Sequence, residues 1–150
     1  MGASSWHYRT AFDGDIAAAL TTLQARVFAV GDYFWAYDGQ YDGMPRQPRP
    51  VSVEELWQDE TTQESGTHSI MDVCRIIGPG DPDDYGTVRP LRPTDVKQLF
   101  GSETPTPEDF DRAVEERTLP DLTPRWSACC MPLFVDGHLT EIAFWGHSGD

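Results

Sequence analysis

The sequence predicts one α+β domain over residues 1–150, built on a mostly antiparallel sheet of about five strands with three or four helices packed mainly on one face. Three observations predict this fold. Aromatic side chains alternate with polar ones near the N-terminus, apolar residues then repeat at helical spacing, and two apolar runs flank Asp136-Gly137. A chain of 150 residues has the length of a single domain and can bury a core.

The first two elements follow from periodicity. Residues 5–12 place Trp6, Tyr8, Thr10 and Phe12 on one face, which predicts a strand. Apolar residues then recur every three or four positions and predict a helix over 15–30. Asp13 or Asp15 can cap the first turn of this helix, and Gly31 suits its C-terminal end.

The segment that follows is rich in turn residues. Residues 32–37 have the composition of a short strand, and the prolines of 43–50 exclude a helix there. Ser52 followed by Glu55 is a capping box, which predicts a short helix to about residue 60 and a polar loop over 61–66.

The central part of the chain is expected to supply two strands and two helices. The β-branched stretch 67–77 predicts a central strand, joined by a wide loop to a second strand at 85–91 in a hairpin. Pro93 opens a helix that ends at Gly101, and Thr106-Pro107 starts another with acidic residues in its first turn.

The strongest local signal is the hairpin over 126–145. A two-residue Asp-Gly loop between apolar runs predicts a type I′ turn, because both turn residues need positive φ. With that turn, Leu133 is expected opposite Thr140 and Met131 opposite Ile142. Residues 146–150 are expected to form a loose tail.

Composition restricts the class of partner. The net charge is −14, and Lys97 is the only lysine, which disfavours nucleic acid and anionic membranes as partners. No apolar stretch approaches 18 residues and the N-terminus does not resemble a signal peptide, so we expect a cytoplasmic protein with reduced cysteines.

Motifs for cofactors and metals are weak. Gly78-Pro79-Gly80 lacks the lysine and the following helix of a phosphate loop. Cys129 and Cys130 with His138 or His147 are the sharpest metal-ligand set, but their spacing matches no known zinc pattern, so we expect neither metal nor cofactor.

Acidic and aromatic residues suggest how a partner is bound. Two stretches of the predicted helices carry carboxylates, and an aromatic run follows the first helix. The predicted partner-binding residues are Glu54, Glu55, Asp59, Glu60, Glu108, Asp109, Tyr33, Trp35 and Tyr37.

These features favour an acidic cytoplasmic protein-binding module that docks on a basic protein partner. In charge and size, though in no motif, it is similar to the immunity proteins and antitoxins that inhibit basic enzymes. One alternative is a small enzyme whose pocket lies between the sheet and the 31–50 loop, with His7, His68 or Asp72 acting in it. Another is that the charge serves solubility alone.

Overall fold

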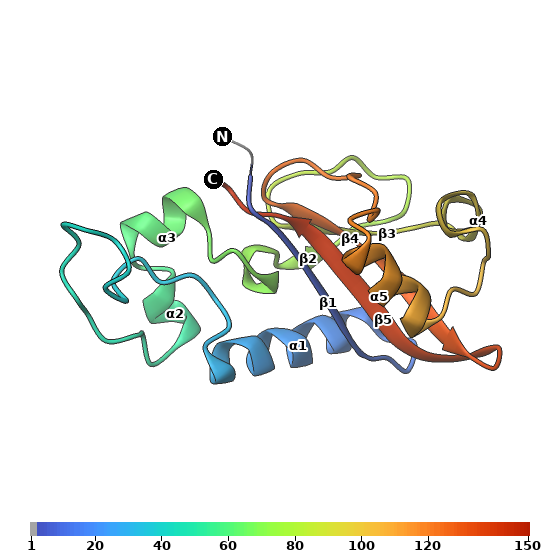
Figure 1. Ribbon diagram of the computed structural model, residues 1–150, viewed down its shortest axis with the longest axis horizontal. Helices are drawn as coiled ribbons and strands as arrows, with labels where there is room; N and C mark the ends of the chain where they lie inside the picture. The colour runs from blue at the N-terminus through green and yellow to red at the C-terminus, as the bar shows by residue number, and fades with distance from the viewer. Residues whose placement is uncertain (1–2) are drawn as a thin grey trace.

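The computed structural model describes residues 3–150 and contains one five-stranded mixed sheet (Figure 1). The strands lie in the order β1-β5-β4-β3-β2. Neighbours β1/β5 and β5/β4 are antiparallel, whereas β4/β3 and β3/β2 are parallel. The strand bounds are β1 Ser5–Ala11, β2 Arg75–Ile76, β3 Thr87–Pro90, β4 Ser127–Val135 and β5 His138–His147. The α+β class and the number of strands agree with the prediction, but the sheet is mixed rather than mostly antiparallel.

Helices surround this sheet, and several begin at the capping residues that the sequence marks. Their bounds are α1 Ile16–Val30, α2 Val53–Leu56, α3 Glu60–Ser65, α4 Pro93–Phe100 and α5 Pro107–Glu115, with a 3₁₀ turn, η1, at Ile70–Asp72. Asp15 caps α1 and Gly31 ends it in the left-handed conformation. Ser52 and Thr106 cap α2 and α5 through their hydroxyls.

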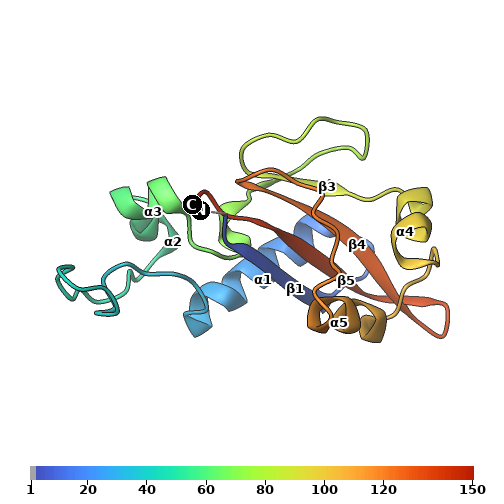
Figure 2. The same ribbon diagram turned by 45° about the horizontal axis from the view of Figure 1, so that its top comes forward.

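Helices cover both faces of the sheet, so the expectation that they pack mainly on one face is wrong (Figures 1 and 2). Even-numbered residues of β4, such as Cys130, pack with Leu23 and Val27 of α1. Odd-numbered ones, such as Met131, pack with Phe110 of α5 and Val96 of α4. Because side chains of a strand alternate, the continuous apolar run of β4 is buried on both sides.

The C-terminal hairpin forms with the predicted turn but not with the predicted register throughout. Asp136 and Gly137 have φ of 51° and 76°, as a type I′ turn requires. A register shift between Leu133 and Phe134 then places Leu133 opposite Glu141 and Met131 opposite Ala143. The expected pairs with Thr140 and Ile142 are therefore wrong by one residue, because the shift displaces every pair beyond it.

The stretch 67–77 differs most from expectation. It contains η1 and only the two-residue edge strand β2, which pairs with β3 in parallel rather than in a hairpin. The side chains of Thr67, Ser69 and Asp72 form hydrogen bonds with one another and with the local backbone. Such local bonds compete with the backbone hydrogen bonds that a strand would need.

Two further segments depart from prediction for similar local reasons. Residues 32–37 form no strand and instead turn, with Phe34 N–H donating to the carbonyl of Thr67. Residues 61–66, expected as a polar loop, lie largely in α3, because the Asp59 carboxylate accepts the N–H of Thr62 and caps that helix.

The expected loose tail is held in place. β5 continues to His147, and the buried Ser148 donates its hydroxyl to Asp72. Gly149 N–H donates to the carbonyl of Ser65, so residues 146–150 are fastened to the rest of the fold.

Gly146 of β5 offers a sharp test of this packing. A Cβ at this position would collide with the Ser127 carbonyl oxygen and with Ala128 on β4. We expect Gly146→Ala to lower the free energy of unfolding by about 2 kcal/mol or more in urea denaturation, as overpacking does. Gly43→Ala, where only the positive φ opposes a side chain, is the control and is expected to cost about 1 kcal/mol. Equal losses for both variants would contradict the packing described for β4 and β5.

Candidate functional site

Residues 31–66 form a projection that we call the acidic lobe. It comprises an irregular segment, α2 and α3, and extends from the end of α1 at the left of Figure 1. Two arginines, Arg46 and Arg49, oppose eight carboxylates there. These carboxylates belong to Asp32, Asp38, Asp42, Glu54, Glu55, Asp59, Glu60 and Glu64.

Two of the three predicted aromatic contact residues are buried inside this lobe. Tyr33 and Trp35 are only 8% and 7% exposed. The Tyr33 ring stacks on Phe28 with centroids 5.8 Å apart, and the Trp35 indole N–H donates to the carbonyl of Gln47. The prediction that Tyr33 and Trp35 contact a partner is therefore wrong, because they anchor the lobe; half-buried Tyr37 packs edge-on against Trp35.

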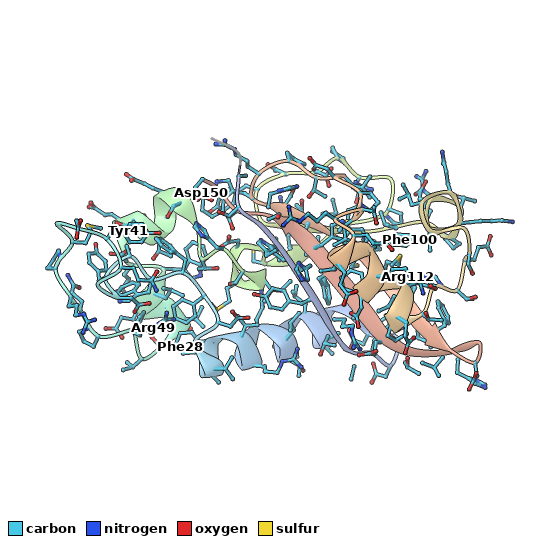
Figure 3. All side chains as sticks on the ribbon, in the orientation of Figure 1. Phe28, Tyr41, Arg49, Phe100, Arg112 and Asp150 are labelled. Atoms are coloured by element: carbon cyan, nitrogen blue, oxygen red, sulfur yellow. The ribbon has the colours of Figure 1, made fainter. Side chains whose placement is uncertain are left out.

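An arginine completes the inner part of the lobe. The Arg49 guanidinium lies 4.6 Å from the centre of the Tyr33 ring and donates to the Asp38 carboxylate at 2.6 Å (Phe28 and Arg49 are labelled in Figure 3). It also donates to the carbonyls of Gly31 and Tyr33. A ring face and a carboxylate thus hold one cation between them.

The six predicted acidic contact residues divide into two kinds. Glu54, Glu60 and Glu108 are exposed. Glu55, Asp59 and Asp109 accept backbone N–H groups near the starts of α2, α3 and α5, and therefore stabilise their helices. Of these three, Glu55 is also exposed.

The two acidic stretches do not meet. Figures 1 and 2 show α2 and α3 at one end of the molecule and α5 against the far part of the sheet. The two acidic stretches therefore lie apart in the fold, and which of them contacts a partner stays a prediction. The lobe combines its carboxylates with the exposed ring of Tyr41.

A pocket of about 320 Å³ opens between the irregular segment of the lobe, α3 and residues at the C-terminus. Its aromatic wall is formed by Phe34 and Tyr41, whose rings meet edge to face with centroids 5.8 Å apart. His68 stacks on Phe34 with centroids 4.5 Å apart. Tyr41 is 52% exposed, so one ring remains open to solvent. The lining is Phe34, Ala36, Tyr41, Met44, Thr61, Ser65, His68 and Asp150.

A histidine and a carboxylate lie together at one side of this pocket. His68 Nε2 is 3.1 Å from Asp150 Oδ2, and the same carboxylate accepts the N–H and hydroxyl of Ser4. The His68 approach lacks hydrogen-bond geometry, so its buried Nε2 has no hydrogen-bond partner within residues 3–150. His68 also has a φ of 52°, unusual for a residue other than glycine.

Asp72 fixes the backbone beside His68 by accepting hydrogen bonds from the preceding residue, Thr67. This carboxylate is 4% exposed and accepts the N–H and the hydroxyl of Thr67 at 2.6 and 2.7 Å and the hydroxyl of Ser148 at 2.7 Å. Burial raises the pKa of Asp72 above its ordinary value, and the bonds from Ser148 and Thr67 partly oppose that rise. Asp72 does not line the pocket; it positions the segment that does.

The residues proposed for an enzyme are separated in the structure. His68 lines the pocket beside α3, whereas His7 lines a different hollow, of about 400 Å³, near α5 with His147 and Asp121. His147 Nε2 lies 2.8 Å from the Asp121 carboxylate there. His7, His68 and Asp72 therefore do not form one catalytic group.

The cysteines offer no metal site in the part of the chain that the structure describes. Cys129 and Cys130 are buried on opposite faces of the sheet. Burial raises the pKa of both thiols, that of Cys130 to about 12. Over residues 3–150, no group of three or more histidine, cysteine or carboxylate side chains is arranged to hold a metal ion.

Comparisons of the chain with protein-family models, with curated proteins and with solved structures gave no match. Within residues 3–150, no helix combines the length and apolar character needed to span a membrane.

The enzyme alternative expected a pocket at the 31–50 loop with His68 in it, but the sequence did not indicate which rings of the loop line it. Alternation along an assumed strand over 32–37 selected Tyr33, Trp35 and Tyr37 as the outward set. The segment turns instead, so Phe34 reaches the pocket with Tyr41. Asp150, in the supposed loose tail, carried no sequence signal.

Asp72 generates a pH prediction. Because its pKa is raised in the folded state, the ionised carboxylate makes a smaller contribution to stability than the protonated one. In Asp72→Asn the amide oxygen can still accept both bonds from Thr67, and the amide NH2 can donate to the Ser148 hydroxyl, without a charge. We expect the free energy of unfolding of Asp72→Asn, relative to wild type, to increase as pH rises from below 3.8, the usual aspartate pKa, through the raised pKa of Asp72 in the folded state. Above that pKa the difference is expected to level off.

Denaturation of both proteins across this pH range measures the effect. Asp72→Ala is the contrasting variant, expected to lose at least about 3 kcal/mol because it leaves buried donors unpaired. It is also expected to speed amide exchange at Ser148 and Gly149. A pH-independent difference between wild type and Asp72→Asn would contradict the raised pKa.

Proposed function

We propose that the protein is a binding module that docks on a basic protein partner through its acidic lobe. The observation that carries this proposal is the excess of eight carboxylates over two arginines in residues 31–66, on a segment that projects from the sheet (Figure 1). Such a surface speeds association with a basic partner and selects against acidic ones.

Arg49, one of the two positive charges of the lobe, supports this reading, whereas Arg46 is exposed. Arg49 is bound internally by Asp38 and Tyr33, so it offsets charge without offering a cation to a partner. Glu54, Glu60 and Glu64 are exposed on α2 and α3. Their exposure leaves them available to basic side chains.

Inhibition of a basic enzyme is the form of this function that charge and size favour. An inhibitor needs a rigid surface that keeps its shape on binding. The buried Tyr33 and Trp35 and the Arg49 contacts supply that rigidity to the lobe. An enzyme whose pocket carries His68 and Asp150 is the second candidate, favoured by their 3.1 Å approach beside an open tyrosine.

A charge-matched pair of variants tests the proposal. The lobe variant combines Glu54→Gln, Glu60→Gln and Glu64→Gln. The control combines Glu103→Gln, Glu115→Gln and Glu116→Gln, which removes the same charge from exposed positions near α5. We expect proteins retained from native lysate by the immobilised wild type to be lost with the lobe variant and kept with the control.

Salt provides an independent readout. Retention by wild type is expected to weaken as salt rises from low to physiological concentration, because the charges that guide docking are exposed and screened. The proposal fails if the two triple variants retain the same proteins equally, or if retention does not change with salt.

A further inference from the structure

We propose that the pocket beside α3 receives a cationic side chain, arginine or lysine, of the basic partner. This inference rests on the proposed function and specifies how the lobe recognises the partner. The pocket, of about 320 Å³, is at the small end of ligand sites in proteins and therefore suits one side chain rather than a large ligand.

The chemistry of the lining suits a long cationic side chain. Phe34, Tyr41 and Met44 form an apolar wall for the methylene stem. The exposed Tyr41 ring offers a face to the charged head, and Asp150 offers a carboxylate. No lysine or arginine lines the pocket.

The surroundings add negative charge. Asp42 follows Tyr41 in the sequence, and α3, which supplies Thr61 and Ser65 to the lining, also carries exposed Glu60 and Glu64. Tyr41 and Asp150, labelled in Figure 3, both lie close to this helix. An anionic ligand would meet this field at the opening and be repelled.

The molecule itself provides a precedent. Arg49 is held by the Tyr33 ring at 4.6 Å and by the Asp38 carboxylate at 2.6 Å. Tyr41 and Asp150 both line the pocket, so a phenol ring and a carboxylate are again present, with the carboxylate also accepting bonds from Ser4. The same chemistry that retains an arginine inside the lobe is thus available to one from a partner.

Small probes test the pocket without a partner. Binding of N-acetyl-arginine amide, N-acetyl-lysine amide and the neutral N-acetyl-citrulline amide is measured by NMR titration against wild type. We expect the two cationic probes to shift the resonances of Tyr41 and Met44, and citrulline to shift them much less. The stronger of the two cations identifies the side chain that the pocket prefers.

Variants locate the site. Tyr41→Ala is expected to weaken cation binding about two- to fivefold, as loss of an exposed cation–π contact does, and Tyr41→Phe to retain it. Asp150→Asn is expected to weaken it as well. Tyr85→Ala removes another exposed tyrosine that packs against an aromatic neighbour, and is the matched control expected to leave binding unchanged. Thermal unfolding confirms that each variant is folded.

The outcomes separate this inference from the proposed function. Equal binding of citrulline and arginine probes, or cation binding unaffected by Tyr41→Ala, overturns the pocket proposal even if the lobe triple variant loses its partner. Conversely, probe binding that depends on Tyr41, together with partner retention by the lobe triple variant, overturns the docking proposal and leaves the pocket as a cation site.

Discussion

The buried carboxylate of Asp72 is the constraint on which the functional end of the molecule depends. A charge taken out of water is tolerated only when donors surround it. Three donors from Thr67 and Ser148 fill this role. Through these bonds, Asp72 joins the segment that follows the lobe, which contains Thr67, to the segment that follows β5, which contains Ser148. Neither Thr67 nor Ser148 lies in a helix or strand.

The geometry of the pocket follows from this attachment. With Thr67 held, the intervening His68 adopts its positive φ and stacks on Phe34. With Ser148 held, Asp150 reaches both His68 and Ser4. Strain of this kind persists only where the surroundings over-determine it, and here two hydrogen-bonded neighbours, Thr67 and Ser69, flank the strained residue.

The parts of the fold that sequence could predict are those determined by local patterns. The capping residues Asp15, Ser52 and Thr106, the helix at 15–30 and the Asp136-Gly137 turn all rest on interactions within a few residues. The parallel pairing of β2 with β3 and the burial of both faces of β4 depend on partners distant in sequence, and no local pattern encodes them.

The candidate site divides in the same way. The negative charge of residues 31–66 is a property of composition and can be counted in the sequence. Which rings remain exposed was not, because it depends on a turn whose conformation is set by contacts such as that between Phe34 N–H and the Thr67 carbonyl. The roles of Ser148 and Asp150 also cannot be predicted from sequence, because they depend on contacts with the distant residues Asp72 and His68.

The pairing of β1 has a consequence for the order of folding. Its partner in the sheet is β5, with Ser5 opposite His147 and Ala11 opposite Glu141. During synthesis β1 and α1 emerge long before this partner. Their apolar faces therefore stay exposed until residues 138–147 have been made and can pair with β1. Such distant pairing slows folding and prolongs exposure of aggregation-prone surface. A net charge of −14 disfavours association between partly folded chains through mutual repulsion.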